Sequence, residues 1–179
     1  MWLRVFQKWV LVSVFGIFGT LIGALRYSPG MNLTLAHIGA RASAKDGFEA
    51  LAQLYLSRSS AFAHCQTECF RSEEALVEWL ERLQGRTPAV TVLLDSRGRQ
   101  MSSEDFAGWL GKRRDEGAQQ IIFAVGPASG WTKAADGRAS LLLSLGPMTL
   151  AHSLARLVVA EQIYRAFTIL SGHPYHTGH

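Results

Sequence analysis

The sequence predicts an α/β fold in which a parallel sheet is flanked by helices. From Met31 onward, short apolar runs of strand length alternate with longer segments whose apolar residues recur at helical spacing. Parallel strands need long crossover connections, so this alternation is typical of a parallel sheet with helices on both faces. The chain has 179 residues, of which 48% are hydrophobic and 18% are charged, which indicates a globular domain with its own core.

The first half of the domain is expected to contain three strands and two helices. Strands are predicted over 32–38, over 61–67 from a weaker pattern, and over 89–94, which has the strongest strand pattern in the chain. A helix is predicted over 44–56. Ser72 is a plausible N-cap for the second helix, because two glutamates follow it in the first turn. Its buried stripe consists of Leu76, Trp79, Leu80 and Leu83.

The next predicted unit is again a helix followed by a strand. Ser102 or Ser103 caps a helix that ends at Gly117, and the run 120–125 is apolar enough for a buried strand. The residues of this helix that should face inward are Phe106, Trp109 and Leu110. These elements extend the parallel sheet by one strand.

The C-terminal segment should form a strand, a tight loop and a long helix. Residues 141–143 are an apolar run, Gly146-Pro147 interrupts the pattern, and helical periodicity continues over 150–170. Gly172 suits the C-terminal end of this helix, and the titratable tail 173–176 follows it.

Residues 1–30 differ from the rest of the chain. Two basic residues precede Trp9–Leu25, an uncharged run whose length fits a short membrane-spanning helix or the apolar part of a signal peptide. A third interpretation is that Met31 is the true start. We favour a spurious or unprocessed extension over a functional anchor, so a single domain is expected over 31–179.

Charge and cysteine content indicate no particular ligand. The formal net charge is +4, but three of the 18 basic residues and none of the 14 acidic ones lie in the first thirty positions, leaving 18 − 3 = 15 against 14. Bulk charge alone therefore does not predict RNA binding. The run Lys112-Arg113-Arg114 is expected to be the solvated face of a helix. Cys65 and Cys69 are expected to be reduced thiols, because their spacing is poor for a disulfide or a zinc site.

Three stretches near the C-terminus form one extended motif. They are Leu143-Ser-x-x-x-Met-Thr-x-x-His152, Arg156-x-x-x-x-Glu-Gln-Ile-Tyr-Arg-Ala166 and Gly172-His-Pro-Tyr-His176. Together they closely resemble the C-terminal signature of the RlmH family. Members of that family are SPOUT-class methyltransferases, which use S-adenosylmethionine to methylate N3 of a pseudouridine in 23S ribosomal RNA.

The resemblance implies an architecture and a partner. The parallel sheet would end in a C-terminal trefoil knot, and two copies would form a homodimer whose long C-terminal helices pack together, so that each tail approaches the partner's cofactor. The enzyme would be cytoplasmic and would act on the assembled ribosome. It would not be a membrane protein unless residues 1–30 are real and retained.

The resemblance also implies the cofactor contacts. They would be Leu94, Gly126 and the loop Gly146, Pro147, Met148, Thr149, Leu150 and Ala151. Glycines suit such a site because backbone groups can approach the adenine edge without an intervening side chain. Where the family usually has Gly-Gly-Pro-x-Gly, this chain has Val125-Gly-Pro-Ala-Ser-Gly130, which puts the contacts of that loop in doubt.

The catalytic residues are expected in the tail. N3 of a pseudouridine is an imide nitrogen that is mostly protonated at neutral pH, so methyl transfer needs a proton acceptor and alignment with the methyl group. His176 is the candidate for the proton, and Tyr175 or Arg156 would hold the uracil face. His152 is expected to pack near the cofactor loop.

The tail also departs from the family pattern. Thr177-Gly178-His179 replaces the basic residue that commonly follows Tyr-His, so a contact to RNA or cofactor would be missing or would come from His179. His173, His176 and His179 could in principle bind a metal, but a terminal tail without supporting residues is a poor site and none is expected.

Two alternatives remain open at this stage. The chain could be a SPOUT methyltransferase for another RNA, such as transfer RNA. It could also be a membrane-tethered RNA- or ribosome-binding protein that has lost activity, which the apolar N-terminus and altered tail would fit. Cofactor binding without methyl transfer to any RNA would favour the second alternative.

Overall fold

A computed structural model describes residues 30–40, 46–85 and 87–177. The apolar run predicted to be an extension lies outside these ranges. The strands are β1 (Asn32–Ile38), β2 (His64–Phe70), β3 (Val90–Gln100), β4 (Gln120–Val125) and β5 (Leu141–Ser144). The helices are α2 (Gly47–Ser59), α3 (Glu73–Arg82), α4 (Ser103–Asp115), α5 (Lys133–Asp136), α6 (His152–Ser171) and the 3₁₀ helix η2 (Pro174–Thr177).

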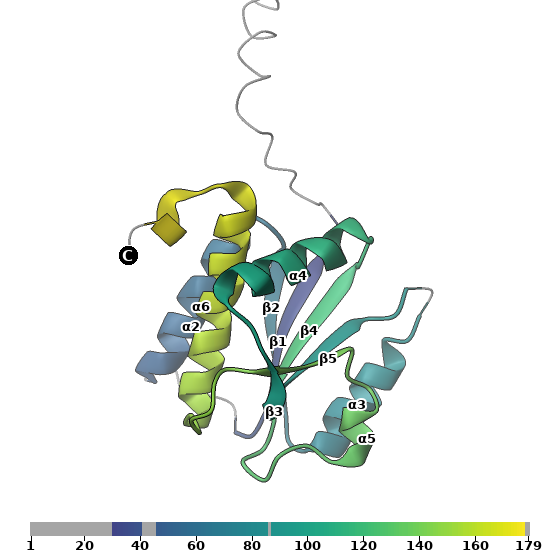
Figure 1. Ribbon diagram of the computed structural model, residues 1–179. Coiled ribbons are helices and arrows are strands. Elements are labelled where there is room, and N and C mark those ends of the chain that lie inside the picture. Colours follow the sequence, from purple (N-terminus) through teal and green to yellow (C-terminus); the bar gives the residue numbers. More distant parts are fainter. Residues whose placement is uncertain (1–29, 41–45, 86, 178–179) are drawn as a thin grey trace, which may run out of the picture.

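The strands form a parallel sheet in the order β2-β1-β4-β3-β5, with helices on both faces (Figure 1). Helices α2, α4 and α6 cover one face, and α3 and α5 cover the other. Alternation along β4 supplies both cores, because Ile121 and Phe123 pack toward the first group and Ile122 and Ala124 toward the second. The predicted fold class of a parallel sheet flanked by helices is confirmed.

Several element boundaries differ from the prediction. Helix α2 begins at Gly47 rather than at 44, because the Asp46 side chain accepts a hydrogen bond from the Phe48 N–H at 3.0 Å and caps it there. Strand β2 lies three residues later than 61–67, since 61–63 close the turn after α2, where the Ala63 N–H donates to the Ser59 carbonyl at 3.2 Å. The short helices α5 and η2 were not predicted.

The predicted helix ends hold elsewhere. Ser72 caps α3 and Ser102, rather than Ser103, caps α4. Gly172 ends α6 with a φ of 68°, the left-handed conformation common at helix C-termini. The basic run Lys112-Arg113-Arg114 lies in the last turn of α4, where each side chain pairs with Glu116 or Asp115, as expected for a solvated helix end.

Strand β3 continues to Gln100, beyond the predicted end at Leu94, because it pairs with β5 twice. Leu94 is opposite Leu143, and after an irregularity Arg99 is opposite Leu143 again. Within this bend, a Cβ atom on Gly98 would lie 2.6 Å from the carbonyl carbon of Leu142. The backbone of β3 therefore bends closely around β5. This arrangement is compatible with a trefoil knot, which itself stays a prediction.

Both cysteines are free thiols on β2, and both are partly buried. Burial raises the pKa of the Cys65 thiol to about 12, so this residue is an unreactive packing group. Within the described part of the chain, no helix combines the length and apolar character needed to cross a membrane.

Candidate active site

A cavity of about 550 Å³ lies at the carboxyl ends of β4 and β5 and beside the bend of β3. Its walls come from 94–97 within β3, from 125–131 at and after the end of β4, and from residues between 143 and 150 before α6, and His152 and Ala155 complete the lining. The volume lies within the usual range for small-molecule sites. In parallel α/β folds ligands bind at this edge of the sheet. The cavity therefore lies where the sequence predicts a cofactor.

Most predicted cofactor contacts line this cavity. Those that do are Leu94, Gly126, Gly146, Met148, Thr149 and Leu150, whereas Pro147 and Ala151 are exposed members of the same loop that do not line it. Met148 is 77% exposed, which is unusual for a large apolar side chain. The structure thus brings residues from three distant segments together, and their contact with a cofactor stays a prediction.

Trp131 joins two walls of the cavity, and the sequence analysis missed it. Its indole N–H donates to the Leu94 carbonyl oxygen at 2.9 Å. The next residue, Thr132, donates its backbone N–H to the buried Glu73 carboxylate at 3.1 Å, and its hydroxyl donates to the same group. These bonds fix the loop after β4 against the end of β3 and against α3.

Gly126 is required by packing. A Cβ atom at this position would lie 2.6 Å from Cε2 of Trp131, because the indole ring lies directly against the glycine. Close approach of a cofactor was the predicted reason for Gly126, but in the structure a side chain of the protein fills its Cβ direction. A tryptophan that follows the second glycine of a Gly-Pro-x-x-Gly loop is the signal that could have indicated this contact.

Gly146 has a φ of 127°, a conformation that side chains oppose. The Ser144 hydroxyl fixes the turn, because it donates to the Gly146 carbonyl oxygen at 3.1 Å and accepts from the Gly146 N–H at 3.2 Å. A Cβ atom on Gly146 would meet no atom within 4 Å. The glycine is therefore needed for its backbone conformation, and the open space beside it belongs to the cavity.

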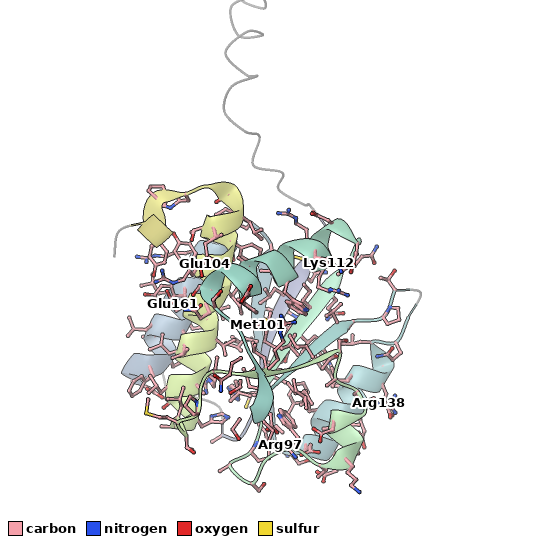
Figure 2. All side chains as sticks on the ribbon, viewed as in Figure 1. Arg97, Met101, Glu104, Lys112, Arg138 and Glu161 are labelled. Atoms are coloured by element: carbon pink, nitrogen blue, oxygen red, sulfur yellow. The ribbon has the colours of Figure 1, made fainter. Side chains whose placement is uncertain are left out.

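One wall of the cavity is acidic. The Asp95 carboxylate is almost fully buried and accepts two hydrogen bonds from the Arg97 guanidinium, at 2.9 and 2.7 Å. Arg97, labelled in Figure 2, also lies 3.6 Å from the Asp136 carboxylate of α5. Hydrogen bonds from Arg97 hold the pKa of Asp95 below its usual range, so two carboxylates share one cation here.

His152 and Arg156 lie at the beginning of α6, beside the cavity. His152 lines the cavity, as expected from its predicted position near the cofactor loop. Arg156 is only 6% exposed and forms an ion pair with Glu49 of α2. Burial lowers the pKa of Arg156 from its usual value. Its guanidinium is therefore held between two helices, and its predicted contact with the target base stays a prediction.

The side chain of Tyr175, in the predicted catalytic tail, packs against the middle of α6. The Tyr175 hydroxyl donates to Glu161 at 3.2 Å, and its ring lies 4.8 Å from the Tyr164 ring. The Arg165 guanidinium lies over the Tyr175 ring, 5.1 Å from its centroid. Burial, a hydrogen bond with a neighbouring tyrosine and the Glu161 charge raise the pKa of Tyr175, so its hydroxyl stays protonated. The side chain of His176 lies outside the described part of the structure, as does His179.

Tail and cavity are therefore separated within one chain. His152 is the first residue of α6, and the tail begins after its last residue, Ser171. Figure 1 shows η2 beside the C-terminal end of α6, while β5 leads into the opposite end. The Tyr175 side chain reaches back to Glu161, which is nine positions after His152, or about 14 Å along a helix. Tyr175 does not line the cavity of its own chain.

A second cavity, of about 420 Å³, lies between α4, α6 and the end of β3. Met101, labelled in Figure 2, lines it, and Leu143, Leu145 and Gly146 separate it from the first cavity. At its side the Ser103 hydroxyl donates to the Gln162 side chain at 2.8 Å, which ties α4 to α6.

Fold and cavity together define a class, namely parallel α/β proteins that bind a small ligand at the carboxyl ends of their strands. The particular family follows from comparison with known proteins. Residues 31–176 match the family described as "Predicted SPOUT methyltransferase", and the chain belongs to this family.

Two curated relatives match most of the chain. It is similar to the ribosomal RNA large subunit methyltransferase H of Koribacter versatilis, with 46% identity over 149 residues, which are 83% of this chain and 100% of the relative. The protein of the same name from Rhizobium etli is 39% identical over 157 residues, 87% of this chain and 94% of that protein. Among solved structures, the SpoU methyltransferase AviRb from Streptomyces viridochromogenes, in complex with AdoMet, aligns with a TM-score of 0.43 and 13% identity over 75% of this chain and 57% of that chain.

Proposed function

We propose that this protein methylates N3 of a pseudouridine in 23S ribosomal RNA, with S-adenosylmethionine as methyl donor, and that it acts as a cytoplasmic homodimer on the assembled ribosome. The observation that supports this most is the cavity built from the bend of β3 and from the segments at the carboxyl ends of β4 and β5, in a chain of the SPOUT methyltransferase family. The relatives named for methylation of large-subunit ribosomal RNA supply the class of substrate.

The residues present fit this cofactor. Leu94 and Leu150 offer apolar contacts, and the segments 126–130 and 146–149 are neither helix nor strand, so much of their backbone is available to hydrogen-bond an adenine edge. Bound there, S-adenosylmethionine would supply an electrophilic methyl group. The protein's task is then to hold the target base in line with that methyl group and to take its proton.

The tail would carry out the second task. His176 is the candidate acceptor for the N3 proton, because a neutral imidazole can take a proton near neutral pH. Tyr175 would hold η2 in place through Glu161 and Tyr164. Its protonated hydroxyl is suited to donating a hydrogen bond and unsuited to accepting the proton.

A homodimer would bring tail and cavity together. In a two-fold dimer with α6 packed antiparallel against its copy, the C-terminal end of one helix lies beside the N-terminal end of the other. An apolar surface for such packing is present on α2, which lies alongside α6. Phe48, Leu51 and Leu54 of α2 are 45%, 46% and 43% exposed, a cluster that soluble monomers usually cover.

Mass spectrometry of nucleosides from 23S ribosomal RNA tests the reaction. Ribosomes from a deletion strain should lack N3-methylpseudouridine, and purified protein with S-adenosylmethionine should restore it. Intact ribosomes, free large subunits and transfer RNA should be compared as substrates, with intact ribosomes expected to react fastest. Persistence of the modified nucleoside in the deletion strain would reject the proposal, and methylation of transfer RNA alone would identify a different target.

A further inference from the structure

A buried histidine, His37, and a partly buried one, His152, meet beside the cavity. His37, near the end of β1, is 5% exposed and lies opposite Val125 in the sheet, immediately before the loop that lines the cavity. Its ring centroid lies 5.7 Å from that of His152, edge to face. Among the described residues, neither Nδ1 of His37 nor Nε2 of His152 has a hydrogen-bond partner, although both atoms are buried. Buried polar atoms are seldom left unpaired, so these two indicate an absent partner.

The position of His37 in the sheet is one where ligands bind. The chain leaves β1 toward α2 on one face and leaves the neighbouring β4 toward α5 on the other. A crevice forms between adjacent strands whose connections depart to opposite faces. The two imidazoles therefore lie at the point where the topology opens the sheet.

The charged groups near the histidines belong to α6 and to the start of α2. Arg156 is paired with Glu49, and Asp46 also lies close enough to affect it. Burial, together with Arg156 and His152, lowers the pKa of His37 to about 4, so its imidazole is neutral at physiological pH. A neutral imidazole offers one N–H donor and one acceptor.

The N-terminus of α6 adds donors at the same place. Helices α2, α3 and α4 each begin with a side-chain cap, but Ala151 provides none for α6, and the first turn contains no acidic residue. The Ala155 N–H donates to the Ala151 carbonyl at 2.8 Å, so the three N–H groups before it have no acceptor within the helix. An uncapped N-terminus with its positive dipole end favours an anion.

We propose that His37, His152 and the first turn of α6 form a carboxylate subsite, whose ligand is the carboxylate of the amino-acid end of S-adenosylmethionine. The inference rests on the cofactor of the proposed function and not on the RNA target. The adenine would then lie toward the loops at Gly126 and Gly146, and the amino-acid end toward α6.

Two ligands that differ in this end provide the test. S-adenosylhomocysteine carries the carboxylate, and 5′-methylthioadenosine lacks the whole amino-acid end while keeping the adenosine. Calorimetric titration of each into full-length protein separates the subsite from the rest of the cavity. Ala151→Asp places a competing carboxylate at the N-cap of α6, His152→Ala removes one imidazole, and His64→Ala is the matched control at the exposed start of β2.

Ala151→Asp should weaken binding of S-adenosylhomocysteine about tenfold or more, leave 5′-methylthioadenosine unchanged, and raise the melting temperature, because a capped helix is more stable. His152→Ala should weaken the binding of S-adenosylhomocysteine alone, by a smaller factor. The control variant His64→Ala should bind both ligands with unchanged affinity. The rise in melting temperature shows that the first variant is folded.

Three results would overturn the subsite. Equal weakening of both ligands would place the effect in the adenosine part or in the fold, and unchanged binding of both would show that the carboxylate lies elsewhere. If wild-type protein binds neither ligand, the proposed cofactor is wrong as well. If the carboxylate-dependent difference is found but no ribosomal RNA is methylated, the subsite stands and the proposed target is wrong.

Discussion

Gly126 and Trp131 are packed so closely that a Cβ atom on the glycine would lie 2.6 Å from Cε2 of the indole. Gly126→Ala must therefore displace the ring that also hydrogen-bonds Leu94. We expect it to destabilise the protein by about 1–3 kcal/mol, the usual cost of overpacking. Trp131→Leu should cost about 2–4 kcal/mol, through lost burial and a lost hydrogen bond.

The effects of the Gly126 and Trp131 substitutions on stability should be strongly coupled. In the double variant the smaller leucine leaves space for the alanine methyl group, so the loss should be at least ~1 kcal/mol smaller than the sum of the single losses. Urea unfolding of the four proteins measures this difference. Additive losses would show that the ring does not occupy the space beside Gly126.

Gly146→Val should abolish cofactor binding while leaving the fold largely intact. The residue has a φ of 127°, which a β-branched side chain strongly opposes, so the turn between β5 and α6 would change its path along the cavity. Calorimetry with S-adenosylmethionine measures the affinity, and circular dichroism checks the fold. Exposed Gly85 offers a control position, where a valine should leave affinity unchanged. Normal affinity of Gly146→Val would exclude this loop from the site.

His176→Ala should lower turnover while sparing cofactor affinity. Removing a positioned proton acceptor typically costs roughly 10²-fold or more in rate. Raised pH should partly rescue the variant, because hydroxide can then form the imide anion. Rates on purified ribosomes across pH decide the matter: a raised KM with a near-normal saturating rate and no rescue would mean that the tail only holds RNA.

His37 should make stability depend on pH. Its pKa is lowered to about 4 in the folded chain from 6.5, so between these values the unfolded chain binds a proton that the native state does not. Stability should therefore fall as the pH drops from about 6.5 to about 4, by on the order of 2–3 kcal/mol from this group. His37→Gln should flatten that part of the profile of unfolding free energy against pH. Equal slopes of unfolding free energy against pH in both proteins would show that His37 is not the group responsible.

A chain that begins at Met31 should keep its fold and its activity. Met31 is 3% exposed and belongs to the larger core, and the family match begins at the same residue. Thermal melting and ribosome methylation of the shortened and full-length proteins should agree. A large drop in melting temperature would show that the apolar run Trp9–Leu25 packs on the domain.

Periodicity was sufficient for the sheet and the long helices, because buried strands and amphipathic helices leave local patterns. β1 and β4 lie at the predicted residues, and the caps at Ser72 and Ser102 are side-chain hydrogen bonds that depend on near neighbours in sequence. Strand β3 beyond Leu94 was missed for the opposite reason. Its last residues are polar and are held by pairing with β5, more than forty positions away.

The site was predicted only where a resemblance supplied it. Residues of the loop after β5 and Leu94 line one cavity, as the resemblance implies. Trp131 and His37 were not found, because each acts through a contact that only the folded chain creates, with Gly126 and with His152. Gly98, a glycine just after the apolar run 89–94, is the sequence signal of the close backbone approach.

The close contact between Gly98 and β5 has a consequence for the order of folding. β5 lies against two stretches of β3, and both β5 and α6 come last in the chain. The four strands β2, β1, β4 and β3 can pair first. The bend at Gly98 is stabilised only when β5 packs against it. Entry of β5 should therefore be a late step, since β5 must pair with both stretches of a bent β3. During that interval the chain would have an incomplete cavity, and a bound cofactor could favour its closure.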